Sequence, residues 1–405
     1  MKHQARAIRN PAAAPAGEHY GVERSAVLSP SGFTAAVKEI SSWPGYEVMP
    51  LLELPALARS LGVGSILYKD ERGRFGLRSF KALGGAYAVA NVLRRKVMEA
   101  TGRRDVGSRD LLSGEFANVI GQATVTCATD GNHGRSVAWG ARLFGCRCVI
   151  FVHEHVRQGR RDAIARYGAE VREVKGNYDD AVRHAAATAA ANGWTVVSDT
   201  SYPGYRDIPL DVMHGYGVMA AEIAQQIGDE APTHVFVQAG VGALAAAICA
   251  SFWLHWGPRR PFFVVVEPTN ADCVYQSLAA GRPVVVGGSL DTVMAGLACG
   301  EVSELAWEIL HHGANAAVAI DDAYALDAMR ALAFPAAGDP AIVAGETGGT
   351  GLAALLAAAD DPAIRATLAL DANSRVLLLG SEGDTDARIY LEVIGRTAEE
   401  VLDEG

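Results

Sequence analysis

The sequence is poor in cysteine and contains no long apolar run. It has only six cysteines among 405 residues, and most of them stand in apolar stretches, which is typical of buried thiols in a reducing compartment. No apolar run approaches the roughly 20 residues of a membrane span, and the N-terminal segment 1–25 lacks the apolar core of a secretory signal. We therefore expect a soluble, cytoplasmic protein without a membrane partner.

Metal-ligand patterns are also missing. Cys146 and Cys148 form C-x-C, but no second pair stands at zinc-finger spacing. Two histidine pairs, at 153 and 155 and at 311 and 312, have no convincing third ligand nearby. We expect no metal site.

Charge is sparse and mostly negative. About 20 % of the residues are charged, and the formal net charge is −10, which argues against a nucleic-acid partner. Half of the residues are apolar, and the length suits two domains rather than one small core. A globular enzyme is the expected class.

Strand and helix signals alternate along the chain. Short β-rich runs separated by helical patterns of about 10 to 20 residues predict βαβ units, and hence an α/β fold with mainly parallel sheets. Strands are expected at 65–70, 125–130, 146–152, 170–174, 195–199, 233–240 and 262–267, and helices at 79–100, 131–145, 157–168, 177–193, 210–228 and 242–257.

The domain plan follows from the same pattern. The segment 1–30 has no sustained periodicity and is expected to form a loose arm. The turn-rich segment around Pro203 and Gly204 is the best candidate for a crossing between domains. We predict that residues 1–78 hold the arm and the first part of a large domain, that 79–204 form a small domain, and that 205–405 complete the large one.

One motif favours a dinucleotide enzyme. Gly240, Gly242 and Ala245 satisfy G-x-G-x-x-A between an expected strand and an expected helix, and Glu267 ends a strand about 20 residues later. Such a loop can hold a nicotinamide dinucleotide, and it can equally hold a monophosphate, because converging N–H groups at a helix start bind any phosphate. A tight turn without a ligand is the third possibility.

Lys81 argues against the dinucleotide. It stands at the start of an expected helix behind Ser79, where the helix dipole disfavours the ammonium form. The neighbouring Phe80, Ala82 and Leu83 suggest burial, which disfavours the charge further. Most lysines at helix starts are solvated, but a desolvated one becomes a neutral amine that can attack an aldehyde.

Several segments together resemble the fold-type II pyridoxal-phosphate enzymes, the threonine dehydratase group. They are "SFKALGGAY" with Lys81, "ATDGNHGRSVAW" with Asn132, "QAGVGALAAA" and "GSEGDTD". Within the group the likeness is greatest to the 2,3-diaminopropionate ammonia-lyases, through "RFGL", "DTSYPGY", "TVMAGLACGE" and "GETGGTG". These markers cover residues 44 to 390 in the family's order.

The resemblance implies two domains, each with a mainly parallel sheet flanked by helices, and pyridoxal 5'-phosphate as cofactor. Lys81 would form the Schiff base with the cofactor, next to Phe80, and Asn132 would bond its phenolic oxygen. Ser381 would meet the pyridine nitrogen with a hydroxyl, which leaves that nitrogen largely unprotonated and favours elimination over transamination. The loop that would hold the phosphate comprises Gly240, Val241, Gly242, Ala243 and Leu244. A substrate carboxylate would lie at the helix start formed by Thr129, Asp130, Gly131 and His133.

Two aspartates carry the substrate argument. Asp130 stands directly before "GNHG", and Asp199 ends the expected strand at 195–199. Each could take the Cα proton on one face of the substrate, so that D- and L-substrates are both used, and both would attract a β-ammonium leaving group. The alternative is that Asp130 caps a helix and Asp199 a turn.

The chain departs from the family pattern at a few positions. Arg78 and Ser79 replace the usual Asn and small residue before "FK", so Arg78 either selects a more acidic substrate or points to solvent. Ala243 replaces a frequent hydroxyl residue of the phosphate loop. Cys273 and Cys299 match positions where the family can carry a cysteine pair, whose oxidation state the sequence does not give.

The sequence therefore predicts a homodimeric pyridoxal-phosphate lyase that removes ammonia from D- and L-2,3-diaminopropionate and yields pyruvate. The first alternative is a serine or threonine dehydratase or another β-eliminating lyase of the same fold. The second is a nicotinamide oxidoreductase that uses Gly240 to Ala245 with Glu267. A catalytically silent homologue is disfavoured by the intact Lys81, Asn132 and Ser381.

Overall fold

The computed structural model describes residues 3–129 and 131–403. The chain divides into two compact units. Unit 1 comprises residues 1–30, 48–79 and 219–405, and unit 2 comprises residues 31–47 and 80–218. A division by contacts does not show which parts fold independently, so the domain boundaries expected after residues 78 and 204 stay predictions.

Unit 1 is built on a seven-stranded sheet with the order β1-β10-β9-β8-β11-β3-β2. The inner strands pair in parallel, and the two edge strands, β1 and β2, pair antiparallel to their neighbours. The strands are β1 (Ala5–Arg9), β2 (Leu51–Glu53), β3 (Ser65–Asp70), β8 (His234–Gln238), β9 (Phe262–Pro268), β10 (Ala316–Ile320) and β11 (Arg375–Gly380).

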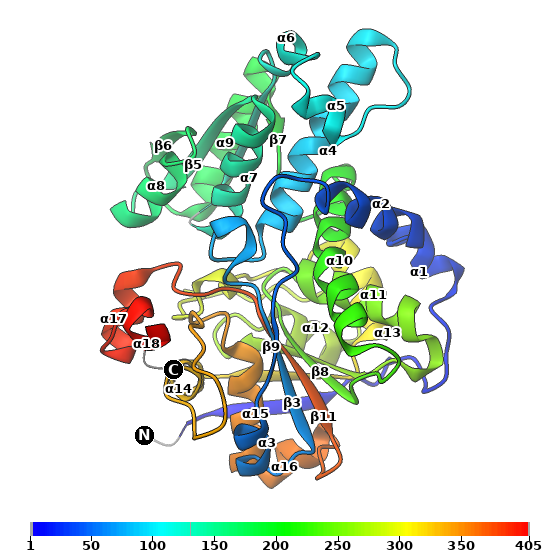
Figure 1. Cartoon of the computed structure of the whole chain (residues 1–405), viewed down its shortest axis with the longest axis vertical. Helices are drawn as coiled ribbons and strands as arrows, with labels where there is room; N and C mark the ends of the chain where they lie inside the picture. The colour runs from blue at the N-terminus through cyan, green and yellow to red at the C-terminus, as the bar shows by residue number, and fades with distance from the viewer. Residues whose placement is uncertain (1–2, 130, 404–405) are drawn as a thin grey trace. The chain divides into compact units, whose positions relative to one another are not determined.

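Helices cover both faces of this sheet, which is why its central strands β8 and β9 are buried along almost their whole length and mostly apolar rather than alternating. In Figure 1, α3 and α15 lie on one side of it and α11 and α12 on the other. The helices of unit 1 are α1 (Gly21–Val27), α3 (Pro55–Ser60), α11 (Ala243–Trp256), α12 (Cys273–Ala280), α13 (Glu304–Gly313), α14 (Asp322–Ala333), α15 (Thr350–Asp360), α16 (Pro362–Thr367), α17 (Ala387–Ile394) and α18 (Ala398–Asp403), with short 3-10 turns at Arg74–Gly76, Gly257–Arg259 and Ala295–Leu297.

Unit 2 is built on a four-stranded parallel sheet with the order β6-β5-β4-β7. Its strands are β4 (Thr124–Ala128), β5 (Arg147–His153), β6 (Glu170–Val174) and β7 (Thr195–Val196), and its helices are α2 (Pro30–Ile40), α4 (Ala82–Thr101), α5 (Ser108–Leu112), α6 (Ala117–Ile120), α7 (Asn132–Phe144), α8 (Gln158–Ala165) and α9 (Tyr178–Asn192). Helix α10 (Asp207–Ile227) begins in unit 2 and ends in unit 1.

The two faces of the unit 2 sheet bind different helices. Val149 and Phe151 of β5 form a core cluster with Ala185 of α9. Ile150 points the opposite way, because side chains alternate along a strand, and it lies next to Gly134 of α7. A Cβ on Gly134 would come within 3.3 Å of Ile150 Cγ2 and 2.1 Å of Thr129 Cγ2. Figure 1 shows α7 and α9 beside these strands.

The expectation of a loose arm over the segment 1–30 is wrong. Residues 5–9 form β1, which pairs antiparallel with β10 from Ala5 opposite Ile320 to Arg9 opposite Ala316. Its partner strand comes much later in the chain, so the local pattern of the arm carries no sign of this pairing. Residues 21–27 add the helix α1.

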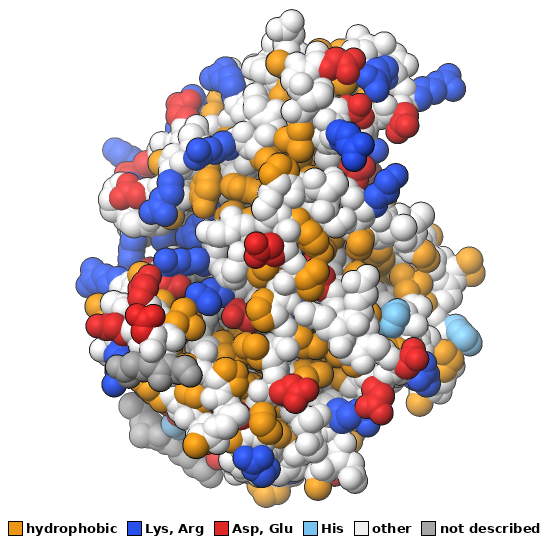
Figure 2. All heavy atoms as spheres, viewed as in Figure 1, with side chains coloured by type: hydrophobic (Ala, Val, Ile, Leu, Met, Phe, Trp, Pro, Cys, Tyr) orange, Lys and Arg blue, Asp and Glu red, His pale blue; other side chains and the backbone are white. Residues whose placement is uncertain are grey.

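No helix among the described residues is long and apolar enough to cross a membrane. Figure 2 shows acidic and basic side chains close together at several places on the face it presents. Arg388 and Glu392, one helical turn apart, form an exposed ion pair with a distance of 2.8 Å. Exposed ion pairs contribute little to stability.

Candidate active site

Lys81 immediately precedes α4, as its N-cap residue. The sequence Gly84-Gly85 that follows lets other helices approach α4 closely. A Cβ on Gly84 would lie 2.4 Å from the Tyr216 ring of α10, and one on Gly215 would lie 2.1 Å from the Leu83 carbonyl oxygen. This close packing holds the buried Tyr216 ring 4.7 Å from the Phe80 ring and 5.8 Å from Lys81 Nζ.

Lys81 and Asp199 form an ion pair. Lys81 Nζ lies 2.6 Å from Asp199 Oδ2, and each side chain is only 21 % exposed. Burial lowers the pKa of Lys81, but the Asp199 carboxylate outweighs burial, so the pKa lies well above its usual value. Burial likewise opposes the charge of Asp199, yet Lys81 and then His133 hold its pKa below the usual range.

The prediction of a neutral amine at Lys81 is therefore wrong for the chain without its cofactor. The helix start and the apolar neighbours do disfavour the ammonium, but a carboxylate that comes from 118 residues later along the chain stabilises it. The prediction considered only neighbours in sequence. Asp199 itself pairs with Lys81, so capping a turn is not its main contact.

The Asp199 loop is anchored by a tyrosine. Strand β7 ends at Val196, and Val197 still donates its N–H to Thr126 of β4. The Tyr205 hydroxyl, 2.9 Å from each partner, donates to the Val196 carbonyl and accepts the Ser198 N–H. Tyr205 therefore fixes the backbone on the N-terminal side of Asp199, where the strand is shorter than the expected 195–199.

The start of α7 supplies three of the predicted residues. The buried Thr129 accepts the N–H groups of Gly131 and Gly134 at 3.1 and 3.4 Å through its hydroxyl. Asn132 is the first residue of the helix. Asp130 lies outside the described residues, so its predicted role is untested.

His133 connects α7 to the Asp199 segment. Its Nε2 bonds the Val197 carbonyl at 2.9 Å, and its Nδ1 lies 3.6 Å from Asp199 Oδ2. A neutral ring that donates through Nε2 turns the Nδ1 lone pair toward the carboxylate, whereas a protonated ring turns an N–H there. The position beside Asp199 was not part of the prediction, which assigned His133 to a substrate carboxylate.

In unit 1, the predicted phosphate loop is the glycine loop between β8 and the start of α11. Gly242 has φ +89° and caps the helix, and a Cβ on Gly240 would lie 3.1 Å from the Gly296 carbonyl oxygen. The N–H groups of Gly240, Val241 and Gly242 make no hydrogen bond to any described residue. Ala243 and Leu244 begin the helix itself, so the five predicted residues all belong to this loop and helix start.

Ser381 follows β11 directly and is almost fully buried. Gln238, the last residue of the neighbouring strand β8, reaches its hydroxyl at 2.6 Å through Nε2. We did not single out Gln238 from the sequence, although a polar residue that ends the apolar strand "HVFVQ" is a visible signal.

Arg78 lies in the same region of unit 1. Its guanidinium pairs with Asp384 of the "GSEGDTD" motif, and its backbone oxygen accepts the Gly383 N–H at 3.0 Å. Ser79 and Glu382 form an antiparallel bridge alongside. Arg78 thus joins the segment before Lys81 to the segment after Ser381, while its side chain stays 44 % exposed to solvent.

Glu267 does not have the surroundings that a dinucleotide enzyme requires. It is fully buried, and its oxygens accept the N–H groups of Val274 and Tyr275 at 2.9 and 2.6 Å, at the start of α12. Burial raises the pKa of its carboxyl to about 8. A carboxyl engaged in this way does not hold a ribose, so the nicotinamide alternative is not supported.

Neither Cys273 nor Cys299 is part of a disulfide bond in the described part of the chain. The Cys273 thiol lies 3.5 Å from the Gly240 carbonyl oxygen, and a Cβ on Gly240 would lie 3.0 Å from Cys299 Sγ. Both cysteines thus border the glycine loop.

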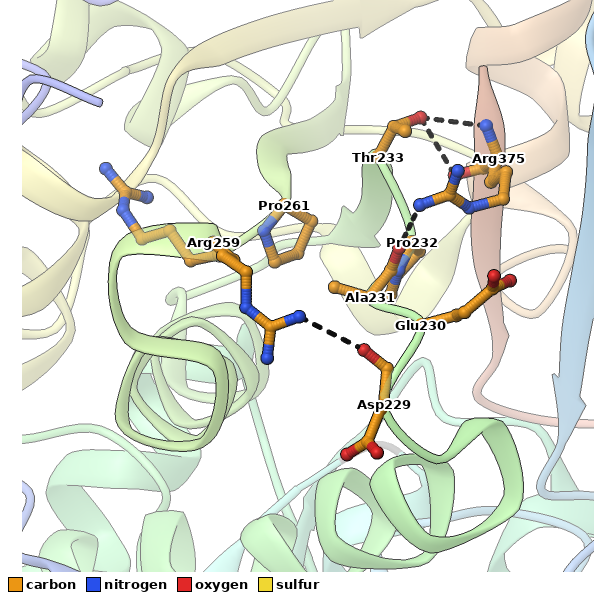
Figure 3. A pocket seen from close by; sticks show the side chains of 9 residues that line it. Asp229, Glu230, Ala231, Pro232, Thr233, Arg259, Pro261 and Arg375 are labelled. Carbon is orange, nitrogen blue, oxygen red and sulfur yellow. Dashed lines mark hydrogen bonds between the residues drawn. The ribbon is translucent and has the colours of Figure 1, made fainter. Parts of the chain in front are cut away.

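Two cavities lined by described residues lie away from these groups. Figure 3 shows one of about 300 Å³ at the amino ends of β8, β9 and β11, where Arg375 donates to Ala231 O at 2.7 Å and Arg259 to Asp229 O at 3.3 Å. The glycine loop stands at the opposite, carboxyl end of β8, where α/β sheets place their ligands. A second cavity, of about 510 Å³, borders α4 and the start of α10 without including Lys81.

Comparison with known proteins decides the family. The family model described as pyridoxal-phosphate dependent enzyme matches residues 43–379. The chain belongs to the pyridoxal-phosphate-dependent enzyme family. It is 43 % identical over 357 residues to the diaminopropionate ammonia-lyase of Escherichia coli strain K12, covering 86 % of this chain and 88 % of the relative.

Solved structures in this pyridoxal-phosphate-dependent family share the whole fold. The holo diaminopropionate ammonia-lyase of Escherichia coli superposes with a TM-score of 0.87 at 38 % identity, over 97 % of each chain. The same enzyme in complex with D-serine gives a TM-score of 0.87 over 98 % of each chain. The expected fold-type II architecture is confirmed.

The residues fit the cofactor of the family, pyridoxal phosphate. Gly240 leaves the space that a larger residue would fill, and the unengaged N–H groups beside it are the donors that a phosphate needs. An amine such as that of Lys81 can bind an aldehyde, and a neutral hydroxyl such as that of Ser381 suits a ring nitrogen.

Proposed function

We propose that the chain is a 2,3-diaminopropionate ammonia-lyase, which converts 2,3-diaminopropionate and water into pyruvate and two molecules of ammonia. Relatives of that name at 43 % and 38 % identity over more than four fifths of the chain support the proposal. The observation that carries it is the 2.6 Å contact between Lys81 Nζ and Asp199 Oδ2, because a dehydratase that acts on serine or threonine needs no carboxylate beside its lysine.

The cofactor, when bound, supplies an electron-withdrawing ring that makes the Cα–H bond of an amino acid acidic. In our proposal Lys81 binds its aldehyde and Phe80 flanks it. Asn132 bonds its phenolic oxygen, and Ser381 its ring nitrogen. The N–H groups of Gly240, Val241, Gly242, Ala243 and Leu244 hold its phosphate.

Asp199 acts as a proton acceptor for one substrate enantiomer. Its pKa is held low by Lys81, so Oδ2 is ionised and can accept a proton from Cα. The same carboxylate attracts the β-ammonium group of 2,3-diaminopropionate, which serine lacks.

The other predicted site residues complete the proposal. Asp130 would take the proton from the opposite face, so that both enantiomers react. Thr129, Gly131 and His133 would hold the substrate carboxylate at the start of α7, where the helix dipole favours negative charge. Because Thr129 already occupies the Gly131 N–H, we assign the direct contact to the remaining N–H groups of this turn.

The test is release of pyruvate from D- and L-2,3-diaminopropionate, with L-serine and L-threonine beside them, by the cofactor-loaded protein. Asp199→Asn is expected to abolish most of the turnover of one enantiomer and to leave the other. Asp211→Asn is a matched control, since Asp211 also pairs with a cation, Arg95 at 2.9 Å, away from Lys81. Turnover of the hydroxy amino acids alone would refute the proposal.

A homodimer and a cytoplasmic location remain predictions from the sequence. Size-exclusion chromatography with light scattering on the loaded protein tests the first. The small-molecule substrate is the partner that the proposal requires.

A further inference from the structure

Gln238 makes three contacts that end at one amide nitrogen. Its Nε2 lies 2.6 Å from Ser381 Oγ, 2.9 Å from the Leu379 carbonyl oxygen and 3.1 Å from the Thr347 carbonyl oxygen. The side chain is 2 % exposed. These partners come from β11, the residue after it, and the loop before α15, all within unit 1.

The two carbonyl groups fix the orientation of the amide. Carbonyl oxygens only accept hydrogen bonds, so the NH2 end must face Leu379 and Thr347. Turning the amide over would place Gln238 Oε1 against two other oxygens. The orientation therefore follows from the backbone and does not depend on the hydroxyl of Ser381.

The proton of Ser381 is directed by this orientation. The two N–H bonds of the Gln238 amide are shared among three acceptors, Ser381 Oγ and the Leu379 and Thr347 carbonyl oxygens. Because an amide nitrogen has no lone pair to accept with, Ser381 cannot donate its proton to Gln238. The Ser381 hydroxyl makes no other hydrogen bond to a described residue. Its own proton must then point away from Gln238.

We propose that Gln238 is a positioning residue that turns the Ser381 hydroxyl so that its proton is donated to the ring nitrogen of pyridoxal phosphate. The inference rests on the contact of Ser381 with that nitrogen in the proposed function. Gln238 does not touch the cofactor and acts only through Ser381.

The placement of Gln238 supports a specific role. It ends a strand whose other four residues, His234 to Val237, are also buried, in the middle of the unit 1 sheet. Its Oε1 is buried and has no hydrogen-bond partner among the described residues. Buried polar atoms without a partner are uncommon in folded proteins, so this glutamine is not explained by stability alone.

The chemical consequence concerns the charge of the ring. A ring nitrogen that accepts a hydrogen bond from a hydroxyl stays neutral, whereas a hydroxyl that faces elsewhere leaves it without a partner. In a Gln238→Met variant the carbonyl groups of Leu379 and Thr347 each lose one of their donors, while the Ser381 N–H and Thr350 still donate to them. Both carbonyl oxygens then have a free lone pair and compete for the Ser381 proton. The hydrogen bond to the ring nitrogen is then weakened although Ser381 is still present.

The experiment uses the full chain loaded with pyridoxal phosphate carrying ¹⁵N in the ring, and reads the chemical shift of that nitrogen and the affinity for the cofactor. Ser381→Ala is expected to move the resonance toward that of a nitrogen without a hydrogen bond. Gln238→Met is expected to move it in the same direction and to weaken binding about five- to tenfold, the worth of one ordinary hydrogen bond.

A double variant separates the roles. If Gln238 acts through Ser381, adding Gln238→Met to Ser381→Ala moves the resonance no further. Gln238→Asn, whose shorter side chain does not reach Ser381, is expected to reproduce the shift and replaces Gln238→Met should that variant fail to fold. Gln226→Met is the matched control, because Gln226 Nε2 also donates to a backbone carbonyl, that of Met49 at 2.9 Å, without touching Ser381.

The outcomes are distinct. A shift in Ser381→Ala but none in the Gln238 variants would overturn the role of Gln238 and leave that of Ser381. No shift of the resonance in Ser381→Ala would overturn the proposed roles of both Ser381 and Gln238. Neither reading depends on turnover, so absence of activity on 2,3-diaminopropionate would refute the proposed function alone.

Discussion

Glu267 makes the stability of the chain depend on pH in a way that one substitution removes. Burial raises the pKa of this carboxyl from 4.5 to about 8, so the folded chain keeps a proton that the unfolded chain releases above about pH 4.5. The stability that this retained proton contributes is complete below about pH 4.5, falls as the pH rises, and stops falling near pH 8. At about 1.4 kcal/mol for each tenfold change in proton affinity, the total is about 5 kcal/mol.

Gln in place of Glu267 cannot ionise. It can accept only one of the N–H groups of Val274 and Tyr275, which lowers stability by about 1–3 kcal/mol at every pH. We therefore expect Glu267→Gln to be less stable than the native chain at pH 5 and to approach or exceed it at pH 8. The measurement is the free energy of urea unfolding of the cofactor-free chain between pH 5 and pH 8.

The control is Glu53→Gln, which changes an exposed carboxylate in β2 and is expected to follow the native pH dependence. If the Glu267→Gln chain also runs parallel to the native chain across this range, Glu267 is ionised in the fold and the reasoning is refuted.

Three further changes have expected outcomes that thermal unfolding and steady-state kinetics can check. Arg74→Met leaves the buried carboxylates of Glu71 and Glu222 without the guanidinium that bonds both at 2.8–2.9 Å. We expect the free energy of unfolding to fall by about 3–5 kcal/mol. An unchanged midpoint of thermal unfolding would contradict a buried charge network. Tyr205→Phe removes the hydroxyl that bonds Val196 and Ser198. We expect the free energy of unfolding to fall by about 1–3 kcal/mol and kcat to fall because Asp199 shifts. Unchanged kinetics would show that the loop keeps its place without the tyrosine. Arg78→Ala is expected to lower the free energy of unfolding by about 1 kcal/mol at low salt and by less at high salt, since the side chain of Arg78 is 44 % exposed. A loss of stability that does not vary with salt would argue against the ion pair.

Regular elements were the most predictable part of the fold. The strands expected at 65–70 and 170–174 coincide with β3 and β6. The first is a short apolar run, and the second, EVREV, combines valine with charged residues after the turn residue Gly168. The strand expected at 195–199 ends at Val196. The apolar pattern continues there, but the Tyr205 hydroxyl takes the Ser198 N–H that a longer strand would use.

The site was predictable where a motif fixes the backbone. The glycine loop and the lysine at the start of α4 follow from local sequence. The protonation state of Lys81 and the contact of His133 with Asp199 did not follow, because both depend on side chains brought together from distant segments. Tyr216 stands between Gly215 and Gly217 in α10, and those two glycines are the signal that could have marked it as a close helix contact.

The order of strands in unit 1 also has a consequence for how the protein is made. Strand β3 ends at Asp70 and is synthesised early, yet it lies between β2 and β11, and β11 is the last strand of the described chain. A nascent chain that has not yet passed Gly380 therefore cannot connect β3 to the rest of the sheet. The segment before Lys81 lacks its partners Glu382 and Gly383 for just as long. Unit 1, and with it the pairing beside Lys81, can be completed only after Gly383 has been synthesised.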